Sequence, residues 1–145
     1  MGRSHSQRMD VSAILACLLL GAASVLAEDL SIETEVEQLG DFHGTIKTPN
    51  YPSNYHNDYE GIWELNIPPT GGIYTLVLVI DEMDIEGTTG HCSDYIKIDH
   101  KEYCGQSPFT IRVPDIEYGI VIDFHTDSSV TGKGFKADYE FVPQY

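Results

Sequence analysis

The sequence predicts an all-β protein, a sandwich of two antiparallel sheets, from three observations. Short apolar segments alternate with polar residues at the period of two that half-buried strands show. Groups of glycine, proline, serine and asparagine separate these segments every eight to twelve residues, which is typical of sandwiches. No segment keeps the helical spacing of apolar residues over several turns. A chain of this size can bury a real core.

The alternation identifies the strands one by one. The expected strands cover residues 63–67, 74–80, 95–98, 118–124 and 135–141. Two of them, YTLVLVI and YGIVIDF, are almost continuously apolar, which indicates deeper burial than strict alternation does. The turns between strands are NYPSNY, PPTGG, EGTTG, CGQSP and SSVTGKG. Trp63, Phe124 and Phe135 are therefore expected in the core.

The first 27 residues predict a removable signal peptide. Arg3 and Arg8 supply positive charge, an apolar run follows, and Val25 and Ala27 fit a cleavage site after Ala27. The apolar run is roughly a dozen residues, whereas a membrane span needs about 20. We therefore expect a secreted, extracellular product without a membrane span, and an uncleaved anchor is the alternative.

The remaining chain divides into an acidic start and one domain. Residues 28–41 are acidic and weakly patterned, which predicts a mobile N-terminal arm, and residues 42–145 form the predicted domain. Removing the leader shifts the net charge from −15 to −16, because two arginines and one aspartate leave. Such a charge argues against nucleic-acid binding and favours cationic partners such as metal ions, basic proteins or a mineral surface. A surface that is charged only for solubility explains the same sign.

The cysteines predict one disulfide. Cys17 lies in the leader, so Cys92 and Cys104 remain as an even pair in an oxidising compartment. Two free buried cysteines are the alternative, and the spacing matches no zinc pattern.

Seven segments, read in order, resemble one family. They are HGTIKTPNYPSNY, ELNIPPTGG, MDIE, HCSDYIKI, YCG, IDFHTDSS and GKGFKADYEF. The ordered set is similar to the CUB domain, an extracellular module of complement-initiating proteases, developmental metalloproteases, spermadhesins and endocytic receptors. The resemblance runs from about residue 44 to residue 141 and implies a jelly-roll β-sandwich. One departure is that most members carry four cysteines. Gly61 or Ile62 occupies the slot of the second cysteine, but the first CUB modules of complement-initiating proteases share this loss.

The acidic stretch VIDEMDIEGTTGHCSDYIKID, residues 79–99, matches a metal site of that family. In the calcium-binding subset, acids at the positions of Glu86, Asp94 and Asp127 are ligands. The position of Ser129 contributes a backbone carbonyl, and the tyrosine at the position of Tyr55 supports the site by hydrogen bonding. Such an oxygen-rich set is what Ca²⁺ prefers. The resemblance therefore implies a calcium site here, and surface charge on a loop is the alternative.

Other acids of the stretch have no assigned role. Met83 and Ile85 are expected to face the core of the sandwich. Asp81, Glu82 and Asp84 are interpreted as solvated charge. An EF-hand loop is excluded, because Met83 takes its third ligand position counted from Asp81.

The resemblance implies a non-catalytic module whose calcium-ordered carboxylates receive a lysine or arginine of a protein partner. An acidic structural protein of the extracellular matrix or of biomineral is the first alternative, and spermadhesin-like binding of carbohydrate or coats is the second. No nucleophile-elbow motif supports a catalytic triad of serine, histidine and aspartate at Ser128 or Ser129. His91 and His125, near the predicted site, are candidates for pH tuning or ordinary surface histidines. Self-association for avidity is left open.

Overall fold

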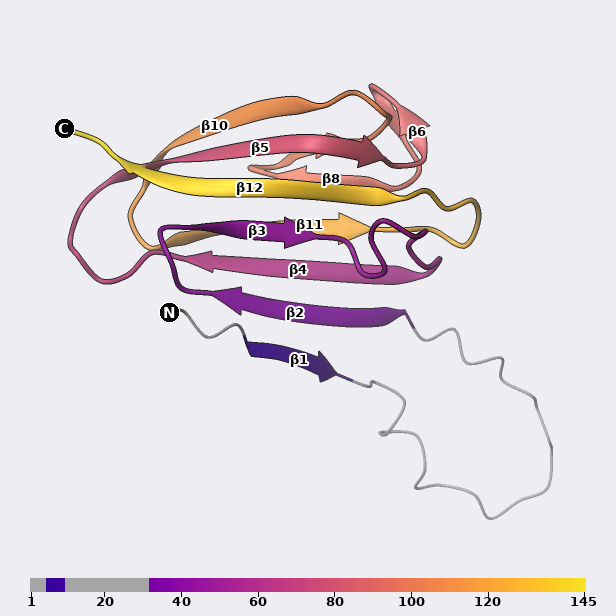
Figure 1. Cartoon of the computed structure of the whole chain (residues 1–145), viewed down its shortest axis with the longest axis horizontal. Coiled ribbons are helices and arrows are strands. Elements are labelled where there is room, and N and C mark those ends of the chain that lie inside the picture. The colour runs from indigo at the N-terminus through magenta and orange to yellow at the C-terminus, as the bar shows by residue number, and fades with distance from the viewer. Residues whose placement is uncertain (1–4, 10–31) are drawn as a thin grey trace, which may run out of the picture.

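A computed structural model describes residues 5–9 and 32–145, and in these residues the chain forms a sandwich of two β-sheets (Figure 1). The first sheet has the strand order β1-β2-β4-β11-β8-β9, the second has the order β10-β5-β12-β3, and β6 and β7 form a small ribbon. The strands are β1 (His5–Met9), β2 (Glu33–Leu39), β3 (His43–Lys47), β4 (Tyr59–Asn66), β5 (Tyr74–Asp84), β6 (Gly87–Thr88), β7 (His91–Cys92), β8 (Tyr95–Ile98), β9 (Lys101–Tyr103), β10 (Phe109–Ile116), β11 (Gly119–His125) and β12 (Gly134–Pro143). The predicted all-β sandwich is confirmed. Across these two ranges we find no helix with the length and apolar character of a membrane span.

The N-terminal arm corrects the sequence prediction. The described part of the predicted mobile arm, residues 28–41, contains strand β2, which pairs in parallel with β4 from Glu33 opposite Tyr59 to Leu39 opposite Leu65. The other described strand pairs are antiparallel. Leu39 packs against the core, so this segment gains both a hydrogen-bonded neighbour and buried apolar surface.

A short strand also lies within the segment predicted as a signal peptide. Strand β1 pairs antiparallel with β2, on the side away from β4. The apolar run and the predicted cut after Ala27 lie outside the described residues. Removal of the leader therefore stays a prediction.

The core lies between the two sheets. On β12, Phe135, Ala137, Tyr139 and Phe141 are buried while the residues between them are exposed, as the alternation predicts. The predicted core aromatics meet at the centre, where Phe135 contacts Trp63 and Phe124 edge-on at ring-centroid distances of 5.3 and 5.8 Å. Burying one such side chain contributes roughly 1.5–3 kcal/mol.

Strand β5 contains an irregularity that sets which side chains of the acidic stretch face the core. Ile80 pairs with Ala137 and Glu82 pairs with Lys136, so Asp81 is one extra residue on β5. This β-bulge resets the alternation. Met83 and Ile85 consequently point into the core, as predicted.

The predicted disulfide is confirmed, and it fixes the turn that follows β5. Cys92 and Cys104 are bonded with a Cα–Cα distance of 5.7 Å. Gly87, which begins β6, has φ +126°, and a Cβ there would lie 2.9 Å from the Cys104 sulfur. Only glycine allows this close approach. The bond closes a loop and is worth roughly 3 kcal/mol in the chain-entropy model.

Candidate functional site

Three carboxylates from separate elements meet at one end of the sandwich. Glu86 follows β5, Asp94 precedes β8 and Asp127 follows β11. Oxygen atoms of all three lie within 4.8 Å of one another. The structure thus brings together the three acids that the sequence singled out, although 41 positions separate the first from the last.

Asp94 is the centre of this group, which we call the acidic triad (Glu86, Asp94 and Asp127). Its side chain is fully buried, and both of its oxygens have donors. The Tyr55 hydroxyl donates to Oδ2 at 2.6 Å, and the Asp127 backbone N–H donates to Oδ1 at 2.8 Å. Burial raises the pKa of the Asp94 carboxyl, and the two hydrogen bonds oppose that shift without cancelling it. A buried acid held in one orientation is unusual for a purely solvating charge.

Tyr55 connects two members of the triad. Its hydroxyl donates to Asp94 and accepts from the Glu86 backbone N–H at 3.2 Å. Its ring is buried and packs edge-on against Phe124 at 5.1 Å. Burial, and next the hydrogen bond to Asp94, raise the pKa of the Tyr55 hydroxyl, so it stays protonated and able to donate.

Glu86 has a carboxylate oxygen that no hydrogen bond satisfies within the described residues. Its Oε2 is buried and has no hydrogen-bond partner among the described residues. Burial raises the pKa of the Glu86 carboxyl, and the charges of Asp127 and Asp94 raise it further. A buried carboxylate oxygen without a donor costs free energy, and a cation would remove that cost. The atoms that the triad could offer to a metal are all carboxylate oxygens, the ligand type that hard cations prefer.

Asp127 is held by the backbone around it. Its carbonyl accepts from the Asp58 N–H at 2.8 Å, and its Oδ1 accepts from the Ser129 N–H at 2.9 Å. Ser129 is exposed, and the contribution of its carbonyl stays a prediction.

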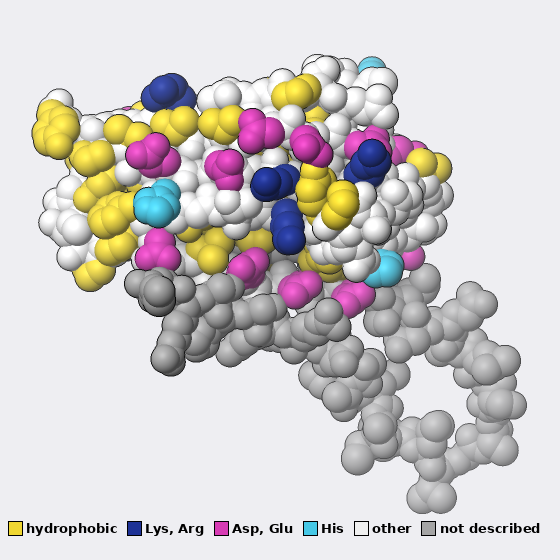
Figure 2. All heavy atoms as spheres, in the orientation of Figure 1, with side chains coloured by type: hydrophobic (Ala, Val, Ile, Leu, Met, Phe, Trp, Pro, Cys, Tyr) yellow, Lys and Arg dark blue, Asp and Glu magenta, His cyan; other side chains and the backbone are white. Residues whose placement is uncertain are grey.

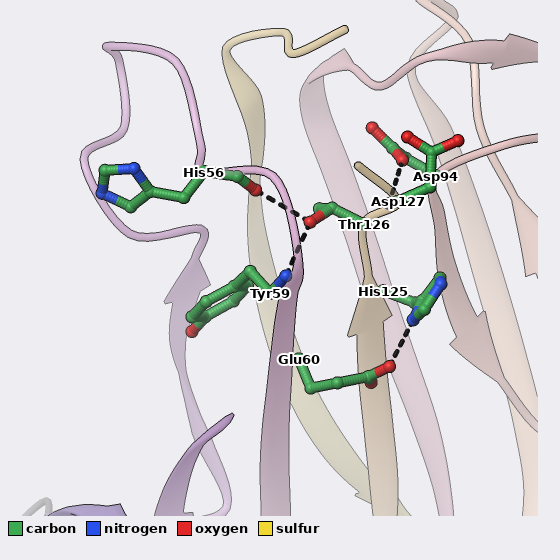
Figure 3. A network of polar contacts seen from close by, with 7 residues as sticks. All are labelled: His56, Tyr59, Glu60, Asp94, His125, Thr126 and Asp127. Atoms are coloured by element: carbon green, nitrogen blue, oxygen red, sulfur yellow. Dashed lines mark hydrogen bonds and ion pairs between the residues drawn. The ribbon is translucent and has the colours of Figure 1, made fainter. Parts of the chain in front are cut away.

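A buried threonine beside the triad was missed by the sequence reasoning (Figure 3). The Thr126 hydroxyl accepts from the Tyr59 N–H at 2.9 Å and donates to the His56 carbonyl at 2.8 Å. These bonds tie the end of β11 to the start of β4 and thereby place Asp127. The one sequence signal that could have pointed to Thr126 is its position next to Asp127.

The two candidate histidines differ in their surroundings. His125 contacts the carboxylate of Glu60, shown as a dashed line in Figure 3, and stacks on Tyr95 at 5.1 Å. A protonated His125 would lower the pKa of the Asp94 carboxyl. His91 lies exposed on β7. A tuning role for either histidine stays a prediction.

Comparison with known families decides the identity of the fold. The family model described as "CUB domain" matches residues 36–139. The chain belongs to the CUB domain family. The match begins inside β2, in agreement with the ordered N-terminal strand.

The chain matches only a small part of the length of its curated relatives. The zinc metalloproteinase nas-39 of Caenorhabditis elegans is 32% identical over 99 residues, which cover 67% of this chain and 10% of that protein. Cubilin of Rattus norvegicus is 31% identical over 111 residues, 69% of this chain and 3% of cubilin.

Solved structures have the same fold. The CUB1-EGF-CUB2 region of human MASP-1/3 is similar with a TM-score of 0.60 and 22% identity, covering 72% of this chain and 40% of that one. The MASP-1 CUB2 domain bound to Ca²⁺ has a TM-score of 0.59 and 26% identity, covering 71% and 96%.

Of the three acids interpreted as solvated charge, Asp81 and Glu82 are exposed, as predicted, whereas Asp84 is half-buried and bonded to the chain. Asp84 accepts hydrogen bonds from the Lys133 backbone N–H at 3.1 Å and from the Gln106 side chain at 3.0 Å. Glu82 accepts from the Tyr51 hydroxyl. Asp81 is exposed on the bulge. Asp84 and Glu82 therefore fasten loops, a role that their sequence context did not show.

Proposed function

We propose that this CUB domain is part of a secreted, non-catalytic protein that binds one calcium ion at the acidic triad and there recognises a lysine or arginine of an extracellular protein. The observation that carries the proposal is the buried Glu86 Oε2, which lacks a hydrogen-bond partner among the described residues and faces two further carboxylates. The likeness to a MASP-1 CUB2 domain that was solved with Ca²⁺ supports it.

Glu86, Asp94 and Asp127 would hold the ion, and Ser129 is the candidate for a backbone ligand. Calcium would supply positive charge against the mutual repulsion of the three carboxylates. Calcium suits this set better than zinc, because the triad offers oxygens and includes neither cysteine nor histidine.

The protein itself orients the carboxylates before a partner arrives. Tyr55 and the Asp127 N–H fix the plane of Asp94, and Thr126 fixes the strand end beside it. Since folding has already ordered these groups, little conformational entropy remains to be lost on binding. An ammonium or guanidinium group would meet negative charge in a fixed position, which favours selectivity for basic side chains.

A CUB domain is a non-catalytic interaction module, so the metalloproteinase relatives owe their activity to other domains. The overall charge of −15 agrees with a basic partner. Bulk charge alone would also suit an acidic matrix protein, and the experiments below separate the two.

The calcium half of the proposal is tested by calorimetric titration of the protein secreted from cells that express the full chain. We expect one saturable site in the wild type and in the control Asp81→Ala, and none in Asp94→Ala. Calcium at 100 times the dissociation constant should stabilise the fold by about 2.7 kcal/mol. Equal binding by Asp94→Ala, or no binding at millimolar calcium, contradicts the site.

The recognition half is tested by NMR titration with N-acetyl-lysine amide and, as its uncharged match, N-acetyl-norleucine amide. Specific recognition predicts amide shifts around Asp94 with the lysine compound alone, and only when calcium is present. A matrix-type polyanion predicts small shifts at many acids, with a graded loss as acids are removed and strong salt dependence.

A further inference from the structure

The outer edge of β2 is the second feature of the molecule that points to a ligand. β2 is held by seven consecutive parallel pairs with β4, without a bulge. On its other side, β1 adds five consecutive antiparallel pairs, from His5 opposite Gln38 to Met9 opposite Thr34. This edge therefore accepts a regular extended strand.

The strand that occupies this edge belongs to the predicted signal peptide. Once residues 1–27 are removed, the N–H and C=O groups of β2 that face β1 have no strand beside them. β2 contains neither proline nor lysine, which commonly protect sheet edges from pairing. Its protection is acidic, with glutamates at every second position (Glu33, Glu35 and Glu37).

Two of these glutamates lie along a groove between the two sheets. Glu35 and Glu37 line it from β2, and Thr45 and Lys47 line it from β3. The groove has a volume of about 530 Å³. Figure 2 shows the acidic side chains in a row over β2. A strand added beside β2 would place every second side chain on the same face as these acids.

The charges select among the possible occupants. A second copy of the chain is disfavoured, because full antiparallel self-pairing of β2 about Val36 sets Glu35 opposite Glu37 of the other copy, twice. A basic residue opposite a glutamate is favourable.

We propose that the exposed edge of β2 in the secreted chain binds an extended segment of a protein partner that carries lysine or arginine at every second position. The segment pairs antiparallel with β2 and directs its basic side chains toward Glu35 and Glu37. This proposal rests on secretion with loss of residues 1–27. It does not rest on calcium, because the acidic triad belongs to other elements.

The test uses the secreted protein in EDTA and a blocked seven-residue peptide that alternates lysine and valine. NMR should show new hydrogen-exchange protection at those amides of β2, residues 33–39, that point away from β4. Two control peptides keep the composition: one groups the lysines in a block, and the other is N-methylated at alternate amides. Both should bind at least about tenfold more weakly, because register and strand hydrogen bonds supply the affinity.

Variants distinguish binding at the β2 edge from attraction by the overall negative charge of the protein. The double variant Glu35→Gln/Glu37→Gln should weaken peptide binding about two- to fivefold for each carboxylate. The matched variant Glu117→Gln/Glu140→Gln has the same net charge, lies elsewhere, and should bind like the wild type. Because the titration is run in EDTA, failure of the calcium site leaves its outcome unchanged, so failure of the calcium site and failure of this proposal are distinguishable.

Three results would overturn the proposal. The first is equal binding of the N-methylated peptide, and the second is shifts at Asp94 rather than on β2. The third is protection, before peptide is added, of the β2 amides that point away from β4. In that case mass spectrometry and sedimentation would assign the edge to a retained leader strand or to a second copy.

Discussion

Two groups of acids lie within a few residues of each other on this CUB domain, and their surroundings differ. Asp84 and Glu82 accept hydrogen bonds from the groups around them, so their charge is satisfied by the chain itself. Glu86 and Asp94 face another carboxylate, and one buried oxygen of Glu86 lacks a donor among the described residues. Both groups belong to the same acidic stretch, residues 79–99. Convergence of three carboxylates around a buried oxygen without a donor is what distinguishes the candidate ligands from the structural acids.

The largest expected effect concerns Tyr55, the link between Glu86 and Asp94. Tyr55→Phe keeps the ring contact with Phe124 but removes the hydroxyl that orients Asp94. Loss of such an orienting bond typically lowers metal affinity about 10- to 100-fold. Calorimetry on Tyr55→Phe measures it. The control Tyr74→Phe loses the contact with Thr70 at 2.6 Å and should keep wild-type calcium affinity. Equal affinities in the two variants would show that Tyr55 is only a core residue.

The next effect concerns Asp84, whose loss should lower the stability of the fold and leave calcium affinity unchanged. Asp84→Ala leaves the Lys133 N–H and the Gln106 amide without their acceptor, so we expect a loss of about 1–2 kcal/mol in the free energy of unfolding. Calcium affinity should not change. Urea denaturation in EDTA measures the loss, and the exposed neighbour Asp81→Ala should stay within about 0.5 kcal/mol of the wild type. A calcium defect in Asp84→Ala would erase the distinction between the two groups.

The smallest effect is the pH dependence of the calcium-free protein. Burial and mutual repulsion raise the folded-state pKa values of Glu86 and Asp94 above those of the unfolded chain. The folded state therefore holds protons that the unfolded state has lost, and this contribution to stability decreases as pH rises from about 4 through the raised values. Urea midpoints in EDTA measure it. The variant Glu86→Gln/Asp94→Asn should show a flatter profile, and an unchanged profile would contradict the shifts.

Much of the fold was predictable because local patterns carry it. The alternation around Phe135 and Phe141 marks β12, and the cysteine count marks the disulfide. Strand β2 was not predictable in this way. Its pairing with β4 joins Glu33 to Tyr59, and it offers only Val36 and Leu39 as strongly apolar residues.

The site was predictable only in part and for a different reason. The resemblance to a family named Glu86, Asp94 and Asp127, whereas spacing alone could not show that three loops converge. The bulge at Asp81 and the bonds of Thr126 depend on partners about 55 to 70 residues away, so no local pattern shows them. The calcium itself and the carbonyl of Ser129 remain predictions.

The most direct measurement is a crystal structure of the secreted protein grown with calcium. We predict one cation bound by oxygens of Glu86, Asp94 and Asp127, with Glu86 Oε2 now contacting the ion or its water. A cation beside Asp81, Glu82 and Asp84, or none at the triad at saturating calcium, would contradict the central claim.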